Sequence, residues 1–462
     1  MLHSNTVNKA RIDAESYSKA EAKYSALLAK SKCEALGNLA YISDGNHLSI
    51  AEGFSISDGV RYLRGQDISS EMMLDDRNPV FIPDSEYKKL GRSHIFKEDL
   101  LITIVGANTG FTALVYEAPN KLTANCKLGI IRVGVQQELP AAYLHAFLAG
   151  NFGQYQIRHA KRGGGQMGLI LPDLKALSIA RFRPQFEQSV ADVSGKGHKL
   201  RQDAKNIFVE AEQILLCFLR MEGWQPANQN AAIKKFSQSF VPTGRLDAEY
   251  YQPKYDELIT KLESVETAKL GDLVSIRKSI EPGSDAYGEE GLPFLRIADV
   301  SKYGITRPSI HVSPDVAENI EELKPKKDTI LLSKDGSVGI AYKLEEDFEG
   351  ITSGALLHLR VTDESVLPDY LNLVLNSITT QMQAERDAGG SIIQHWRPEQ
   401  IREVVIPILP SAVQQNIAEK VQTSFAARRQ SQQLLELAKQ TVERAIENSE
   451  DEALRWLQAQ LH

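Results

Sequence analysis

Residues 10–17 read ARIDAESY, and residues 244–251 read GRLDAEYY, 234 positions further along a chain of 462 residues. The match continues through Lys23-Tyr24 and Lys254-Tyr255, and then through LGNL at 36–39 and LGDL at 270–273. Self-similarity over such a length indicates one structural unit used twice. This duplication decides the fold.

The register of the repeat can be followed to the end of each half. Matching segments are Leu63-Arg64 with Leu295-Arg296, Asn108-Thr109-Gly110 with Ser337-Val338-Gly339, Gly163-Gly164 with Gly389-Gly390, and Glu187-Gln188 with Gln414-Gln415. The offset between the halves shrinks slowly because their loops differ in length. Two copies of one unit account for the whole chain.

Composition is that of a soluble globular protein with two or three domains, since 42% of the residues are hydrophobic and 24% are charged. No apolar run approaches the length of a membrane helix, and the polar residues 1–8 lack a signal pattern, so we expect a cytoplasmic protein. Cys33, Cys126 and Cys217 are far apart and outside any C-x-x-C spacing. They are expected to be reduced structural thiols, and no metal site is predicted.

The two halves differ in charge. Residues 1–243 carry 29 Lys and Arg against 24 Asp and Glu, a net of +5, whereas residues 244–462 carry 24 against 36, a net of −12. If both halves bind one kind of polyanion, the second half must do so through a local patch or with the help of a basic partner.

Periodicity predicts a helical opening, a strand-rich middle and a helical close in each unit. The opening helix is expected at 13–30, buried strands at 100–105 and 129–133, and a short helix at 141–152 with its counterpart at 368–377. The sequence therefore predicts a mixed α/β fold with two tandem pseudo-repeated domains.

The closing helices carry a heptad pattern with alternating steps of four and three residues. Its positions are Val193, Gly197, Leu200, Ala204, Ile207, Ala211, Ile214 and Phe218 in the first helix, and Ile417, Val421, Ser424, Arg428, Ser431, Leu435, Ala438, Val442 and Ala445 in the second. We expect a pair of long antiparallel coiled-coil helices, with its weakest contact at Gly197 and at the polar stretch 424–431. An amphipathic helix lying on its own domain is the alternative.

These patterns predict five segments. They are an N-terminal domain at 1–183, a spacer helix at 184–221, a linker at 222–243, a second domain at 244–409, and a second spacer helix with the C-terminal tail at 410–462. The linker is rich in Gly, Pro and Asn. Its residues Trp224, Phe236 and Phe240 suggest that it is docked.

With this duplicated order of strand-rich domain and long helix, the chain resembles the DNA specificity subunit of Type I restriction–modification systems. The resemblance lies in LRIADV at 295–300, LLSKDGSVG at 331–339, and Ile406-Pro407 leading into QQNI at 414–417. It covers nearly the whole chain and is closer in the second half. In the first half, ARFRP at 180–184 replaces the usual apolar, proline-rich edge.

The resemblance implies that each strand-rich unit is a target recognition domain reading one half of a split sequence in double-stranded DNA. The paired helices would act as a ruler between the halves. The subunit would have no activity and no cofactor of its own. Its partners would be two adenine methyltransferase subunits, which use S-adenosylmethionine, and restriction (translocase) subunits in a full complex, with no membrane.

The sequence itself contains no Walker-type phosphate loop, no H-E-x-x-H and no G-x-S-x-G. It also lacks the tetrapeptide, Asn or Asp followed by Pro-Pro and an aromatic residue, with which adenine methyltransferases hold a flipped base. A non-enzymatic recognition subunit agrees with these absences.

Two glycine-containing loops are candidates for DNA contact, because cations bind phosphates and amides pair with base edges. The candidates are Arg158, Lys161, Arg162, Gly164, Gly165 and Gln166 in the first loop, and Ser391, Gln394, His395 and Arg397 in the second. A plain solvated turn is the alternative for each loop.

Two shorter polar loops lie between apolar runs, and they contribute the candidates Asn108, Thr109, Lys334 and Ser337. Their side chains differ between the copies, as residues reading different bases should, although neutral drift would look the same. Tight-turn chemistry alone explains Gly110 and Gly339. The pairs Arg64 with Asp67 and Arg296 with Asp299 are predicted to be structural ion pairs, because both halves keep them.

Two other classes of function remain open from the sequence. A pure protein-binding scaffold would fit the acidic second half and the long helices. A solitary specificity-like protein that modulates a resident restriction–modification system would share every feature above, and only the neighbouring genes would distinguish it.

Overall fold

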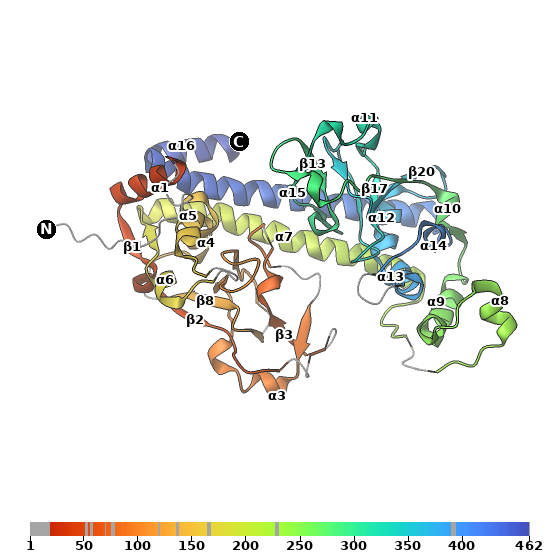
Figure 1. Cartoon of the computed structure of the whole chain (residues 1–462). Coiled ribbons are helices and arrows are strands. Elements are labelled where there is room, and N and C mark those ends of the chain that lie inside the picture. The colour runs from red at the N-terminus through yellow and green to blue at the C-terminus, as the bar shows by residue number, and fades with distance from the viewer. Residues whose placement is uncertain are drawn as a thin grey trace. The chain divides into compact units, whose positions relative to one another are not determined.

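A computed structural model describes residues 19–50, 54–55, 59–69, 71–74, 79–118, 121–134, 138–163, 168–226, 231–389 and 394–461. The chain divides into two compact units, which are Met1–Arg201 with Arg429–His462 (unit 1) and Gln202–Arg428 (unit 2). Figure 1 shows the elements of both. The part of the predicted opening helix before α1 (Lys19–Lys30) lies outside the described residues.

Unit 1 is built on a four-stranded antiparallel sheet in the order β2 (Ala40–Asp44), β8 (Leu128–Val133), β5 (Leu100–Thr103), β6 (Thr112–Leu114). Strand β5 is buried along its whole length, which explains its continuous apolar run. A second sheet has the order β4 (Val80–Ile82), β3 (Val60–Leu63), β7 (Leu122–Ala124), and its β3–β7 pair is parallel.

Unit 2 repeats this plan with one more strand in its second sheet. Its main sheet has the order β11 (Val274–Lys278), β20 (Leu356–Val361), β17 (Ile330–Ser333), β18 (Ala341–Lys343). The second sheet has the order β12 (Tyr287–Gly288), β16 (His311–Val312), β13 (Leu292–Leu295), β19 (Ile351–Thr352), again with one parallel pair, β13–β19. The predicted duplication and the mixed α/β fold are confirmed.

The short helix expected at 141–152 is in fact two helices, α4 (Ala141–Ala149) and α5 (Asn151–Ala160). The chain is extended at Gly150 (ψ 174°), which ends the first helix. In unit 2, Ser377 (ψ 165°) separates α12 (Pro368–Asn376) from α13 (Ile378–Asp387) in the same way. Gly150 was not recognised as a helix end, whereas the helix predicted at 368–377 ends at Ser377 as expected.

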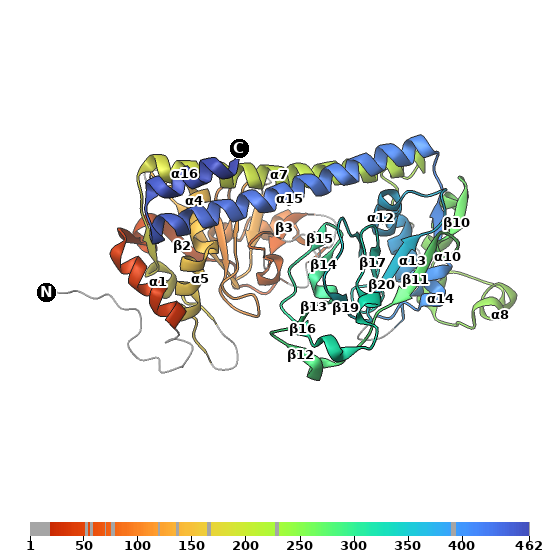
Figure 2. The ribbon, with the colours of Figure 1, turned by 90° about the horizontal axis from the view of Figure 1, so that it is seen from above.

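The closing helices are α7 (Pro184–Phe218) and α15 (Ser411–Glu447), and they pair in both units. In unit 1, Gly197 lies against Ser431 and Leu435. In unit 2, Ser424 Oγ donates to the Ala204 carbonyl at 2.6 Å. Within unit 2, Ala204 contacts Ser424 and Glu210 accepts from Lys420, so partner numbers fall as α7 numbers rise and the pairing is antiparallel as predicted (Figure 2).

The heptad positions predicted for α15 all face the interior, with Arg428 and Leu435 half-buried and the other positions buried. In α7 the prediction is only half right. Gly197, Ala204 and Ala211 are buried, but Phe218 is 40% exposed. Buried positions at the following residues, Phe208, Leu215 and Leu219, replace Ile207, Ile214 and Phe218. Both phases show steps of four and three, so the pattern alone could not choose between them.

The contact expected to be weakest is a close one. A Cβ atom added at Gly197 would lie 2.9 Å from Leu435 Cγ and 3.2 Å from the Ser431 carbonyl oxygen. Ser424 and Ser431 are 1% and 0% exposed. Small side chains let the two helices approach each other, so a sequence stretch poor in large apolar residues marks close packing here.

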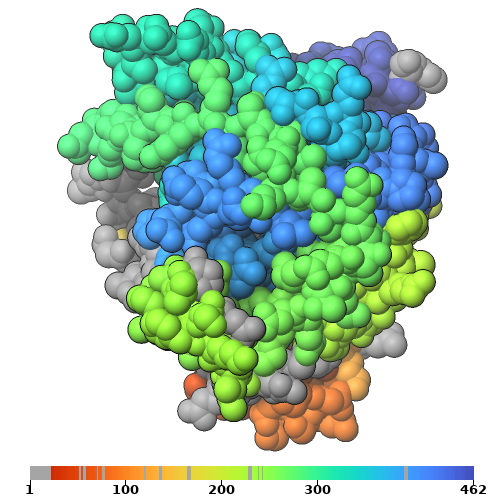
Figure 3. All heavy atoms as spheres, turned by 90° about the vertical axis from the view of Figure 1, so that its right-hand side faces the viewer, coloured from red at the N-terminus to blue at the C-terminus, as the bar shows by residue number. Residues whose placement is uncertain are grey.

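Among the described aromatic residues of the linker, Trp224 is docked and the two phenylalanines are exposed. Trp224 packs against the core of unit 2, with the Lys261 ammonium 5.5 Å from its ring centre. Phe236 is 63% exposed and Phe240 is 37% exposed, and their rings stack on each other at 5.1 Å. The expectation that both phenylalanines are docked was therefore wrong; their segment lies on the face that Figure 3 shows.

We expect Gly197→Val to lower the free energy of unfolding by about 1–3 kcal/mol, because the added side chain overpacks the helix contact. The matched control is Gly195→Val on the same helix, where an added Cβ would lie 3.6 Å from the nearest Tyr116 atom, an ordinary distance. The control should be neutral or slightly stabilising, since Val is a better helix former than Gly. Denaturant unfolding of both variants measures this, and equal effects would contradict the close contact.

Candidate nucleic-acid interface

In unit 1 the two candidate loops meet where β5 ends. The Leu169 amide donates to the Ile104 carbonyl at 2.8 Å, which joins the glycine loop to the polar loop. Arg162 and Gly168 exchange two backbone hydrogen bonds of 2.8 Å across the base of the glycine loop. We call residues 104–110 with 158–163 and 168–169 surface 1.

Unit 2 contains the same junction where β17 ends. The Gly336 amide donates to the Gln394 carbonyl at 2.8 Å, and the Trp396 amide donates to the Lys334 carbonyl at 2.7 Å. Gly389 and His395 close the base of the second glycine loop with bonds of 3.1 and 2.7 Å. We call residues 334–339 with 388–389 and 394–397 surface 2.

The tips of both glycine loops lie outside the described residues. They include the candidates Gly164, Gly165, Gln166 and Ser391. The turn glycines are described and agree with the prediction. Gly110 and Gly339 have φ values of 97° and 84°, and a Cβ there would lie within 3 Å of Ile157 and Gln381. Only glycine fits both demands.

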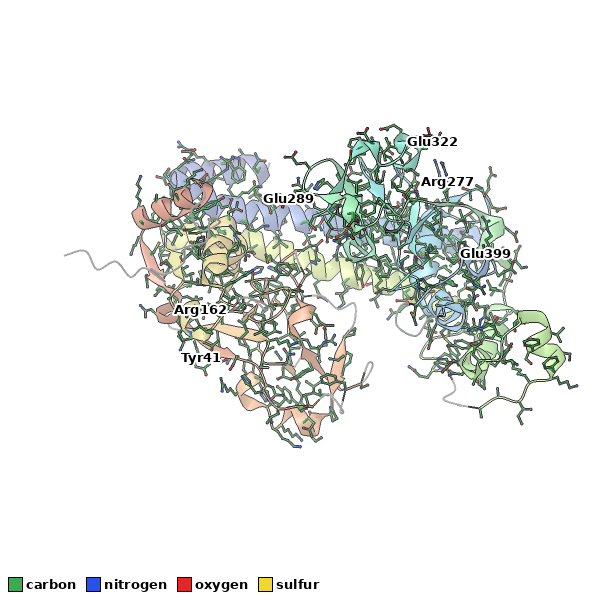
Figure 4. All side chains as sticks on the ribbon, viewed as in Figure 1. Tyr41, Arg162, Arg277, Glu289, Glu322 and Glu399 are labelled. Carbon is green, nitrogen blue, oxygen red and sulfur yellow. The ribbon has the colours of Figure 1, made fainter. Side chains whose placement is uncertain are left out.

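Surface 1 carries three cations in different states. Arg158, near the end of α5, is exposed. Burial, and then repulsion from Arg158, lowers the pKa of the half-buried Lys161. Arg162 Nη2 donates to Asp173 Oδ1 at 2.6 Å, so a phosphate must compete with that carboxylate (Figure 4).

The polar loop of surface 1 is held by its own side chains. Asn108 Nδ2 donates to the Ile68 carbonyl at 3.0 Å. Thr109 is 3% exposed and its hydroxyl donates to the Gly106 carbonyl at 2.6 Å. Both predicted contact residues therefore shape the loop in this structure.

Surface 2 is organised around a carboxylate. Asp335 is bonded to the Lys334 ammonium, and Asp335 Oδ1 lies 2.8 Å from Nδ1 of His395, whose side chain is 62% exposed. Burial opposes ionisation of Asp335, but the hydrogen bonds from Lys334 and His395 outweigh it and lower its pKa. The loop thus offers a charged acceptor beside a donor.

The other candidates of surface 2 are exposed. Ser337 and Gln394 are both exposed. No side-chain hydrogen bond from either of them to another described residue is recorded. Arg397 precedes α14 (Pro398–Arg402), and its Nε donates to Gln400 Oε1 at 3.3 Å. Exposed amide, hydroxyl and guanidinium groups can reach base edges and phosphates.

The structural ion pairs predicted from the repeat are confirmed. Arg64 Nη2 lies 3.0 Å from Asp67 Oδ1, and Arg296 Nε lies 3.7 Å from Asp299 Oδ2. In both copies the aspartate also accepts the backbone amide of the arginine, at 2.8 and 2.9 Å. These residues cap the 3₁₀ turns after β3 and β13.

The sequence missed two features of this interface. It treated the polar and glycine loops as separate candidates, although the backbone joins them. It also gave no role to the Asp335–His395 contact, which links residues 60 positions apart. The only sign in the sequence that the loops act together was that the side chains of both loops differ between the two copies.

The described residues contain no group of three or more His, Cys, Asp or Glu placed to hold a metal ion. Cys33, Cys126 and Cys217 are free thiols, as expected. Across the same ranges no helix combines the length and apolar character that a bilayer crossing requires.

Comparison with known proteins gives one family. Residues 263–438 match the model of the Type I restriction modification DNA specificity domain. The chain also aligns with the S subunit of a Type I restriction–modification system from M. genitalium (13% identity, 93% of this chain and 94% of that chain, TM-score 0.37). The HsdS subunit from Thermoanaerobacter tengcongensis aligns at 16% identity over 90% and 97%, with a TM-score of 0.30. No curated protein matches.

The family match identifies residues 263–438 as a DNA specificity domain of the kind found in Type I restriction–modification systems. It confirms the resemblance drawn from the sequence for that part of the chain. The internal repeat carries the same plan into the first half of the chain.

We expect Asp335→Asn to strengthen binding of non-specific duplex DNA, because the carboxylate repels phosphate and neutralises Lys334. The slope of log affinity against log salt concentration should become steeper by about one unit, because about one more counterion is released on binding. The control is Asp363→Asn, the same charge change just beyond the other end of strand β20. Fluorescence anisotropy at several salt concentrations measures both, and an equal gain in both variants would mean a general charge effect.

Proposed function

We propose that the chain reads a bipartite target in duplex DNA, with each unit recognising one half. The observation that carries this proposal is the junction of two loops, built twice with the same backbone bonds and different side chains. A conserved scaffold with altered side chains is what two readers of different sequences require.

We further propose that the chain positions two DNA adenine methyltransferase subunits, which would supply S-adenosylmethionine chemistry, and restriction subunits where these are present. The charge of the second half supports a partner. At a net of −12, this half as a whole repels the DNA backbone. A basic partner would supply the missing phosphate contacts.

The helix pair would set the distance between the half-sites. Helices α7 and α15 have 35 and 37 residues, which corresponds to a length on the order of 50 Å at about 1.5 Å per residue. One turn of DNA is roughly 34–36 Å. A solitary specificity-like protein would use the same surfaces and would differ in lacking an adjacent methyltransferase gene.

We expect Gln394→Ala to relax specificity in one half-site only. The loss should be roughly 1–3 kcal/mol if the amide makes a bidentate contact with adenine. Methylome sequencing of cells that express the variant with methyltransferase subunits measures it. Gln415→Ala, an exposed glutamine on α15, is the control and should leave both halves unchanged. Loss in both halves from Gln394→Ala would argue against independent reading.

We expect four residues inserted between Glu210 and Ala211 to lengthen the recognised spacer by one or two base pairs. The insertion adds about 6 Å of helix and shifts the heptad pattern without abolishing it. Sequencing of methylated sites should show the same half-sequences at the new spacing. A folded, active variant with the original spacer would show that the helices do not set the distance.

A further inference from the structure

In each unit, a hairpin of the recognition domain places one side chain against both long helices. The hairpins follow the ion pairs Arg64–Asp67 and Arg296–Asp299, and their described residues are 68–69 with 71–74 and 300–305. The residues concerned are Glu71 in unit 1 and Tyr303 in unit 2. They correspond when counted from the ion pairs, since 64 and 71 plus 232 give 296 and 303.

Glu71 is bonded to both helices of unit 1. Its Oε2 accepts from Arg201 Nη2 of α7 at 2.6 Å, and its Oε1 accepts from Gln432 Nε2 of α15 at 3.1 Å. The Arg201 and Glu71 side chains are 14% and 20% exposed. Partial burial strengthens such a charged hydrogen bond over one at the open surface.

Tyr303 occupies the corresponding place in unit 2 by different chemistry. Its ring centre lies 5.2 Å from that of Phe208 of α7, in an edge-to-face arrangement. The Arg428 guanidinium of α15 lies 5.2 Å from the centre of the Tyr303 ring. Lys302 adds a cation 5.4 Å from the Phe208 ring. An aromatic and cation–π contact therefore replaces the ion pair.

The two contacts use corresponding positions of the long helices. Helices α7 and α15 begin at 184 and 411, an offset of 227, and Arg201 plus 227 is Arg428. The residues after Glu71 and Tyr303, Met72 and Gly304, have positive φ values of 59° and 149°. Each unit thus uses one arginine to hold its hairpin residue. Arg201 of α7 contacts Glu71 in unit 1, and Arg428 of α15 contacts Tyr303 in unit 2.

The contact in unit 1 lies beside a cavity. A cavity of about 190 Å³ adjoins Glu71 and is also lined by Met72, His145, Ser194 and Leu435. The hairpin is joined to the recognition loop, because Asn108 Nδ2 donates to the Ile68 carbonyl. A change at Glu71 can therefore reach surface 1 through one hydrogen bond.

We propose that Glu71 and Tyr303, with Arg201 and Arg428, are positioning residues that fix the angle of each recognition domain on the helix pair. That angle limits the spacer lengths that the protein accepts. The inference rests on the proposed function, bipartite DNA recognition. It assigns spacer fidelity to two specific contacts in addition to helix length.

The test uses the full chain with its methyltransferase subunits and a DNA library whose spacer varies by up to two base pairs. In Arg201→Met, which keeps the aliphatic stem, both half-sequences should be retained. Discrimination between the correct and neighbouring spacers should fall by roughly ten- to a hundredfold, the effect of losing one charge-assisted hydrogen bond. Tyr303→Leu should do the same from unit 2. Lys199→Met, an exposed cation on the same helix, is the control and should leave discrimination unchanged.

Rescue separates positioning from general stability. The double variant Arg201→Glu with Glu71→Arg should restore spacer discrimination. If Arg201→Met does not fold, Glu71→Gln, which keeps the side-chain shape, should show the same loss of spacer discrimination. Unchanged discrimination in the folded single variants would overturn the proposal, as would failure of the charge swap to restore it at wild-type melting temperature. Absence of sequence-selective methylation in the wild type would instead contradict the proposed function.

Discussion

The antiparallel contact between α7 and α15 is the constraint on which both units depend, because neither sequence repeat completes its own core. The core of unit 1 includes Leu434, Ala438 and Val442, which belong to the second repeat. The core of unit 2 includes Phe208, Ala211 and Leu215, which belong to the first. Each recognition domain therefore folds against a helix contributed by the other half of the sequence. The repeat seen in the sequence and the unit seen in the structure are different pieces of chain.

This exchange explains which sequence predictions succeeded. Local patterns were sufficient for the ion pair Arg64–Asp67, for the turn glycine Gly110 and for the heptad of α15, since each depends on neighbours a few residues away or on one clear period. The α7 phase was wrong because Ile207 and Phe208 both suit an apolar seam, and only the partner helix selects Phe208. The contact at Gly197 was misjudged for a related reason. A missing side chain looks like lost contact in a sequence, whereas it permits close approach in a structure.

The candidate site was predictable in composition and not in assembly. The loops around Asn108 and Arg162 were recognised from their residue types, but their union depends on the backbone bond between Ile104 and Leu169. The pairing of Asp335 with His395 likewise needs the two loops to be adjacent. Such contacts join distant parts of the chain, and no periodicity reports them. The duplication was the one long-range signal, and it located both surfaces.

The same comparison between copies separates what recognition needs from what it can vary. Backbone junctions and turn conformations persist in both units, while surface 1 is cationic and surface 2 centres on a carboxylate. The hairpin contacts extend this rule to the interior of each unit. An ion pair at Glu71 and an aromatic contact at Tyr303 differ in charge, salt sensitivity and partner, yet each joins one hairpin residue to both helices. The two copies therefore share the place of the hairpin against both helices and not the chemistry of the contact. An orientation of the hairpin can be fixed by either kind of contact, because each one reaches both helices.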